Sequence, residues 1–206
     1  MTSPHPDLPG QLADPATLAD SPHAWPVSAS EQGFSNGYLR VDVDTIVDPE
    51  AGEHARVVVQ PHGAVGVLAI DDADRILLVE QYRHPVRHRM LEIPAGILDV
   101  VGEDPLAAAI RELAEEADLA ADDWERELGL FATPGYSSER LTVFRASGLH
   151  AVPHTERTDR VAEEGDMQQW WVPFDAAVDA VLDGRITDSK TVAALLAEQV
   201  RRSRVR

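Results

Sequence analysis

The stretch that decides the fold is GILDVVGEDPLAAAIRELAEEADL, residues 96–119. It contains a helix start, because Asp is a favoured N-cap and Pro a favoured first helical residue, and Asp104 is followed by Pro105. The residues that follow are good helix formers apart from Ile110. Asp118 can end the helix, since Asp tolerates the left-handed conformation better than most residues. These features predict a helix that begins at Pro105 and ends just before Asp118.

Carboxylates are concentrated on one part of this predicted helix. Glu112 and Glu116 are four residues apart and share a face, and Glu115 lies beside them. Like charges at this spacing repel, so a compensating cation is expected. Arg111 can pair with Glu115, and a divalent cation between Glu112 and Glu116 would remove the remaining repulsion. Mg²⁺ prefers such oxygen ligands. The alternative is a solvated acidic face with no bound ion.

The other side of the predicted helix is apolar. We expect this side to pack on a sheet while the acidic side faces a cleft. The apolar residues are Leu106, Ala109, Ile110, Leu113 and Ala117.

Composition narrows the classes of function. The chain has 206 residues and a net charge of −18, which suits one domain and argues against binding to nucleic acid or to anionic membranes. There is no cysteine, so disulfides and thiolate sites are excluded. We find no apolar run long enough to span a membrane and no secretory signal at MTSPHPDLPG. The expected location is the cytoplasm.

Residues 1–33 are rich in Pro, Asp, Ser and Ala and show no period, so they are expected to form a flexible or loosely docked arm. Strands and helices alternate over the rest of the chain, which predicts an α+β or α/β fold with a mixed sheet. The expected strands are 38–46, 56–60, 65–70, 76–79, 127–131, 141–146 and 168–172, and residues 91–96 are expected to form a short extended segment that ends in a tight turn. The expected later helices are 174–182 and 189–201.

Residues 96–119 resemble the Nudix box, G-x5-E-x7-R-E-U-x-E-E-x-G-U, in which U is aliphatic. Eight positions match in type: Gly96, Glu103, Arg111, Glu112, Leu113, Glu115, Glu116 and Leu119. Six residues instead of five separate Gly96 from Glu103, and Asp118 replaces the last glycine. Both departures leave the spacing of the helix glutamates intact. The resemblance implies a Nudix fold, a mixed sheet sandwiched between helices.

Two segments before the box resemble the ADP-ribose pyrophosphatase branch, particularly its actinobacterial members. They are EQYR, residues 80–83, and EIPAG, residues 92–96. The resemblance implies that Arg83 and Glu92 bind substrate, and a guanidinium suits bidentate phosphate recognition. It also implies that the Ala95 carbonyl is a metal ligand. An ordinary surface role is the alternative for Arg83.

Two segments after the box also resemble this branch. TPGYSSER, residues 133–140, resembles the loop beside the terminal ribose, so Glu139 is expected to bind substrate; a polar turn is the alternative. EEGDM, residues 163–167, resembles a loop that supplies a catalytic glutamate, and a solvated charge cluster is the alternative. We favour Glu164 over Glu163 as the general base. Glu115 and Arg111 are the further catalytic candidates.

The arm at 1–33 lies outside the resemblance, which implies an antiparallel β extension at 34–61 used in dimerisation and a Nudix domain at 62–206. The exchanged strands of a homodimer would bring Arg56, and with it His54 and Trp25, to the adenosine pocket; an ordinary surface role is the alternative for all three.

The implied reaction is hydrolysis of ADP-ribose to AMP and ribose 5-phosphate. Two or three Mg²⁺ ions, or Mn²⁺ in their place, would be held by Glu112, Glu115, Glu116 and the Ala95 carbonyl. One rival reading is hydrolysis of another nucleoside diphosphate sugar, such as a GDP- or UDP-sugar. The other is a non-catalytic ADP-ribose sensor that regulates transcription, which the acidic charge disfavours.

Overall fold

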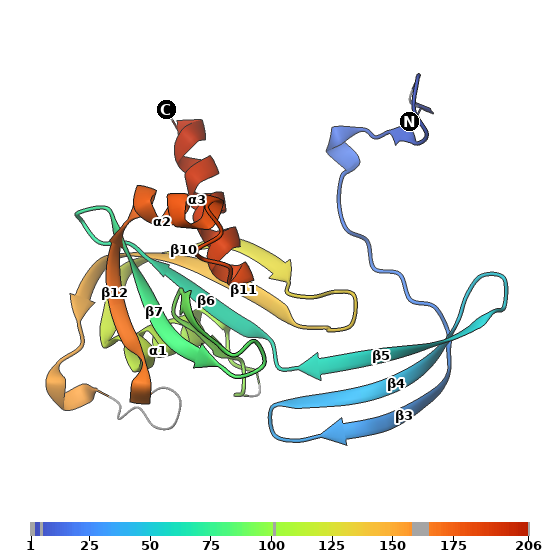
Figure 1. Cartoon of the computed structure of the whole chain (residues 1–206), viewed down its shortest axis with the longest axis horizontal. Helices are drawn as coiled ribbons and strands as arrows, with labels where there is room; N and C mark the ends of the chain where they lie inside the picture. The colour runs from blue at the N-terminus through green and yellow to red at the C-terminus, as the bar shows by residue number, and fades with distance from the viewer. Residues whose placement is uncertain (1–2, 5, 101, 158–164, 206) are drawn as a thin grey trace. The chain divides into compact units, whose positions relative to one another are not determined.

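A computed structural model describes residues 3–4, 6–100, 102–157 and 165–205 (Figure 1). The chain divides into two compact units. One unit comprises Met1–Ser30 and Asp44–Arg56, and the other comprises Glu31–Val43 and Val57–Arg206. The second unit contains the helices α1 (Pro105–Ala117), α2 (Phe174–Leu182) and α3 (Ser189–Val205).

The larger unit is built on a four-stranded mixed sheet. Its strand order is β10 (Leu119–Phe131), β11 (Arg140–Ala151), β6 (Ala64–Ala69) and β9 (Ala95–Ile97). β11 and β6 run parallel, whereas the β10–β11 and β6–β9 pairs are antiparallel. β9 pairs residue by residue with the start of β6, which places the segment before α1 at the edge of this sheet.

A second sheet in the same unit has three antiparallel strands. Its order is β12 (Gln168–Pro173), β7 (Arg75–Arg83) and β8 (His88–Glu92). β7 therefore continues to Arg83, beyond the predicted strand at 76–79, because its polar end pairs with β8. This pairing brings Arg83 and Glu92 into neighbouring strands.

The core lies on both faces of β6. Val65, Val67 and Ala69 are buried together with α1, whereas Leu68 and Ile70 are buried with side chains of α2 and α3. A strand covered on both faces is expected to be apolar throughout, as this one is. The mixed α+β class predicted from the sequence is confirmed.

A third sheet is formed by β3 (Val27–Ser35), β4 (Leu39–Val47) and β5 (Glu53–Pro61), in that order. The sequence predicted β4 and β5 but not β3, which lies largely within the segment expected to be an arm. β3 has no buried face to impose an apolar alternation. Polar contacts hold β3 against β4 instead, since the Ser30 hydroxyl donates to the Asp44 carboxylate (2.6 Å). The division at residues 33 and 61 stays a prediction.

Short elements complete the described chain: β1 (Ser3–Pro4), β2 (Gln11–Leu12) and the 3-10 turns η1 (Pro15–Thr17) and η2 (His154–Glu156). Within the described ranges, none of the helices combines the length and apolar character that crossing a membrane requires.

Candidate active site

Helix α1 has the caps that the sequence predicts. The Asp104 carboxylate accepts a hydrogen bond from the Leu106 amide (2.8 Å), and Asp118 is left-handed with φ of 55°. The buried face differs from the prediction in one respect, because Ile110 is 44% exposed and Ala108 is buried. The buried stripe passes instead through Glu112 and Glu116. Two of the carboxylates thus lie on the packed side of the helix.

Glu112 and Glu116 are held against the turn that precedes the helix. Their residues are only 8% and 5% exposed. The Ala95 amide donates to the Glu116 carboxylate (2.8 Å). At Gly96, a Cβ atom would lie 1.9 Å from the carboxyl carbon of Glu112, so a larger residue there would displace this carboxylate. The Pro-Ala-Gly turn is therefore shaped around these two carboxylates.

Arg111 compensates the negative charge of this cluster. Its guanidinium donates to Glu112 (2.7 Å), to Glu115 (3.1 Å) and to Glu103 (3.2 Å). The Glu103 hydrogen bonds are the largest reason that the pKa of Arg111 lies above its ordinary value, although burial opposes them. The predicted pair with Glu115 is present, and the structure adds the two other carboxylates. Asp99 also lies 3.6 Å from this guanidinium, so Arg111 contacts four carboxylates at once.

The donor set suits a hard divalent cation. Glu112, Glu115 and Glu116 lie on one helix, and the Glu116 carboxylate binds the Ala95 backbone; carboxylate and carbonyl oxygens are the ligands that Mg²⁺ prefers. Among the described residues, no three acidic or histidine side chains converge as a ready-made metal cluster. Arg111 holds Glu112 and Glu115 in this arrangement, so an ion would share these oxygens with the guanidinium.

A second cluster surrounds Glu92, which is 1% exposed. Arg83 donates two hydrogen bonds to the Glu92 carboxylate (2.9 and 2.8 Å). Lys190 donates to the same carboxylate and to Asp188 (3.0 Å). Burial would raise the pKa of Glu92, but the hydrogen bonds and charges of Arg83 and Lys190 outweigh it and lower this pKa. Glu92 is thus an ionised anchor between two cations.

These groups line one cavity of about 540 Å³. Four residues singled out in the sequence for substrate or metal meet there: Arg83, Glu92, Ala95 and Glu139. Gly96, which touches Glu112, also lines it. The cavity therefore joins the cationic cluster at Glu92 to the turn that holds the acidic helix.

Glu139 reaches this cavity from an ordered turn. The Ser137 amide donates to the Thr133 carbonyl (3.0 Å), and the Glu139 amide donates to the Ser137 hydroxyl (3.2 Å). The Val59 amide on β5 donates to the Tyr136 carbonyl (2.8 Å). The loop at 133–140 is therefore a hydrogen-bonded turn that borders the cavity.

The lining of the cavity does not include the predicted residues Arg111, Glu112, Glu115 and Glu116 of α1, and three further predicted site residues are not placed there. Glu163 and Glu164 lie outside the described residues. Arg56 belongs to the smaller unit and is exposed on β5, where its guanidinium donates to the Ala55 carbonyl (2.9 Å). The roles expected for these three residues stay predictions.

Sequence reasoning missed Asp188, Lys190 and Thr191 at the start of α3. The Ile93 amide donates to the Thr191 hydroxyl (2.9 Å), which in turn donates to Asp188 (2.7 Å). The sequence contained one indication of Lys190, because it is the only lysine among 206 residues, whereas 17 positions carry arginine.

The mixed sheet, the capped acidic helix and the glycine turn packed against its carboxylates define the class of protein. A family model described as the NUDIX domain matches residues 60–195. The chain belongs to this family.

Individual relatives agree with this assignment. The chain is 38% identical over 175 residues to the ADP-ribose pyrophosphatase of Mycobacterium tuberculosis, covering 85% of this chain and 83% of that protein. It is 34% identical to the methanol dehydrogenase activator of Bacillus methanolicus, covering 81% and 88%. A crystal structure of an ADP compounds hydrolase has a TM-score of 0.72 at 20% identity, covers 88% of this chain and 95% of that one, and shares the fold.

Proposed function

We propose that the protein is a hydrolase that cleaves the diphosphate of ADP-ribose to AMP and ribose 5-phosphate. The observation that carries the proposal is the cavity that is lined by Arg83, Lys190 and the Ala95–Gly96 turn. A diphosphate needs cationic groups on one side and the reacting machinery on the other. The name of the Mycobacterium tuberculosis relative supports the choice of ADP-ribose.

The metal-binding residues in this proposal are Glu112, Glu115, Glu116 and the Ala95 carbonyl. Bound Mg²⁺ or Mn²⁺ would neutralise the diphosphate and activate the attacking water. Arg111 positions Glu112 and Glu115 through the hydrogen bonds described above. The hydrogen bond from the Ala95 amide fixes Glu116 against the same turn.

Arg83 binds and orients the diphosphate in this proposal. Glu92 uses two of the guanidinium donors, and the remaining donors can bind phosphate oxygens. The water oxygen forms a bond to phosphorus while the bond to the bridging oxygen breaks. Glu164 or Glu163 would accept the proton of that water.

Substrate assignment is tested with a panel of diphosphates. The purified protein is incubated with Mg²⁺ and ADP-ribose, a GDP-sugar or a UDP-sugar, and products are identified by mass. We expect AMP from ADP-ribose with the highest kcat/KM. A preference for a GDP- or UDP-sugar would transfer the proposal to that substrate. No turnover of any of them would favour the non-catalytic sensor.

The metal-site assignment is tested by Glu112→Gln and Glu116→Gln, which keep the shape of the side chain and remove its charge. Each variant is expected to lower kcat by about 100-fold or more, because the oxygen ligands lose their charge. An unchanged melting temperature would show that the fold survives. Near-normal kcat in either variant would contradict the assignment.

We also propose a homodimer that exchanges strands of the β3–β4–β5 sheet, and a cytoplasmic location. Many of the large apolar side chains of these strands are exposed, among them Phe34, Val43 and Val57. An exposed apolar surface of this kind is typical of an interface. Light scattering on the purified protein is expected to give twice the mass of 22.5 kDa. A monomer would contradict the proposal.

A further inference from the structure

Lys190 is unusual in this chain because every other basic side chain that is always charged is an arginine. The one lysine is not on the open surface. Its side chain is 13% exposed, lines the cavity, and contacts the buried Glu92. The single lysine thus lies at the wall of the cavity, whereas the other basic side chains that are always charged are arginines.

The position of Lys190 is fixed from several sides. Asp188 caps α3, because its carboxylate accepts from the Thr191 amide (3.0 Å) and hydroxyl (2.7 Å). Thr191 is fully buried and binds the Ile93 amide, which joins the start of α3 to the end of β8. This hydrogen bond between the Thr191 side chain and the Ile93 backbone holds the start of α3, and with it Lys190, beside Glu92.

Donor counting shows what Lys190 can still bind. An ammonium has three donors. In the described part of the chain, its contacts are with Glu92 and Asp188, which use two of them. Arg83 shares the Glu92 carboxylate and also lines the cavity. Glu92 therefore holds two cations side by side, and each retains donors for a ligand.

We propose that Lys190 is a second substrate-binding cation, which with Arg83 binds the diphosphate or terminal phosphate oxygens of the substrate. Glu92 is the positioning residue that holds the two cations together. The inference rests on the proposed diphosphate substrate and adds a residue to its site. A compact ammonium suits this place because it can direct three donors to three acceptors around one atom, whereas a guanidinium is a broad planar fork.

The single lysine makes a direct measurement feasible. Labelling with ¹⁵N-lysine gives one side-chain ammonium resonance. We expect α,β-methylene ADP-ribose, which cannot be hydrolysed at its bridge, to shift this resonance in the presence of Mg²⁺. Adenosine, which lacks phosphate, is expected to leave it in place. The shift of the resonance is also measured with GDP-mannose and with inorganic pyrophosphate.

Variants add a functional readout. Lys190→Met is expected to weaken binding of the analogue, measured by calorimetry, and to lower kcat/KM, each by about 10- to 100-fold, the scale of a charged hydrogen bond. Lys190→Arg keeps the charge and is expected to recover part of this loss. Arg185→Met is the matched control, since Arg185 precedes the same helix but pairs with the exposed Asp183 outside the cavity. It is expected to bind normally.

The outcomes separate the two proposals. A lysine resonance that shifts with GDP-mannose but not with the ADP-ribose analogue would overturn the substrate and support Lys190. A resonance that none of the phosphate ligands shifts would overturn the role of Lys190. So would a Lys190→Met variant that binds the analogue as tightly as the wild type. If Lys190→Met lowers the melting temperature, the resonance and the Lys190→Arg variant still decide the question.

Discussion

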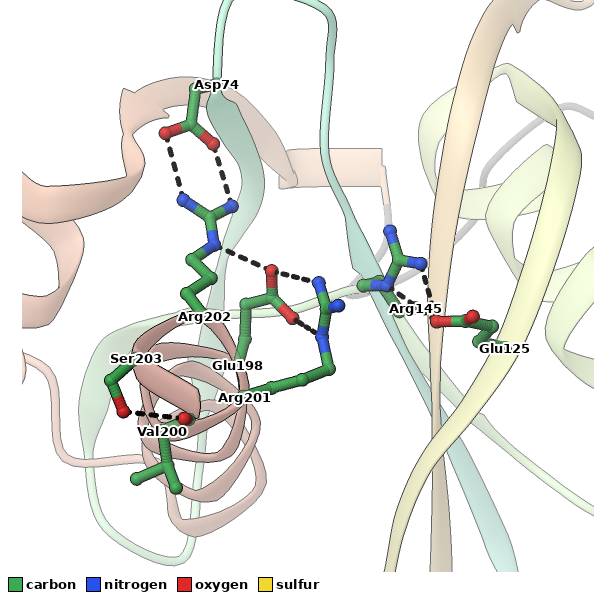
Figure 2. Close-up of polar contacts among 8 residues, drawn as sticks. All are labelled: Asp74, Glu125, Arg145, Glu198, Val200, Arg201, Arg202 and Ser203. Atoms are coloured by element: carbon green, nitrogen blue, oxygen red, sulfur yellow. Dashed lines mark hydrogen bonds and ion pairs between the residues drawn. The ribbon is translucent and has the colours of Figure 1, made fainter. Parts of the chain in front are cut away.

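Glu92 and Glu198 are two carboxylates that are each 1% exposed and each bound by two basic side chains, near opposite ends of helix α3. Glu92 binds Arg83 and Lys190. Glu198 accepts from Arg201 (2.6 and 2.7 Å) and from Arg202 (2.7 Å), as Figure 2 shows. In both clusters burial would raise the pKa of the acid, and the neighbouring cations lower it.

The two clusters differ in the further contacts and the location of their basic side chains. Arg202 continues to Asp74 through two hydrogen bonds (2.9 and 2.7 Å; Figure 2) and lies 3.7 Å from the centre of the Phe174 ring. It thereby ties α3 to the turn before β7 and to the start of α2. Arg201 and Arg202 also border cavities, but Arg83 and Lys190 line the cavity that contains the Ala95–Gly96 turn. The same arrangement of charges thus holds helix α3 in place at one end and lies at the wall of the candidate active-site cavity at the other.

The largest expected difference is in activity. Glu92→Gln is expected to lower kcat/KM by about 100-fold, because Arg83 and Lys190 lose the charge that positions them. Glu198→Gln is expected to leave kcat/KM near the wild-type value. Steady-state kinetics on the preferred diphosphate measures both. Equal losses in the two variants would remove the functional distinction between the clusters.

The next largest effect is expected on stability, at Glu198. Glu198→Gln is expected to lower the free energy of unfolding by about 2 kcal/mol, because both arginines lose a buried partner but can still reach water. Urea denaturation measures this loss. Unchanged stability would mean that Arg202 and Asp74 fasten the helix without Glu198.

Acid should weaken the Glu198 cluster. The folded-state pKa of Glu198 lies below the ordinary value of 4.5, since the hydrogen bonds of Arg201 and Arg202 overcome burial. A carboxylate of this kind stabilises the fold above its ordinary pKa and loses that contribution as the pH falls through its lowered value. The difference in unfolding free energy between wild type and Glu198→Gln is therefore expected to shrink below about pH 4.5. A difference independent of pH would contradict the assignment.

The smallest effect is expected at Glu127, a half-buried residue at an irregularity in the β10–β11 pairing. Burial, followed by the charge of Glu198, raises its pKa above 4.5. The ionised form therefore destabilises the fold at neutral pH, and protonation relieves this cost. Glu127→Gln is expected to stabilise by about 0.5 kcal/mol at pH 7, with the gain vanishing below pH 4.5. Thermal unfolding at both pH values tests this.

Local features of the chain were readable from the sequence because they act over a few residues. Asp104, Pro105 and Asp118 set the ends of α1 by capping and backbone preference, and the structure confirms both ends. The pair between Arg111 and Glu115 follows from helical spacing. Ile110 shows the limit of such reasoning, since helical periodicity predicts an apolar face but tertiary packing decides which side of it is buried.

Strand β3 shows a second limit. Every residue of Val27–Ser35 is exposed, so burial imposes no alternation of apolar and polar side chains. Its pairing rests on backbone and polar contacts with β4, the next strand along the chain, such as that between Ser30 and Asp44. A pattern based on hydrophobicity could not detect it.

The sequence by itself determined the acidic helix, its glycine turn and the family to which they belong, because these depend on residue type and short spacing. Only the tertiary structure decided that Lys190 meets Glu92, 98 positions away, whereas Glu198 meets Arg201 and Arg202 on its own helix. Contacts of that range depend on how β8 and α3 pack. That packing makes one buried glutamate part of the cavity and the other part of the framework.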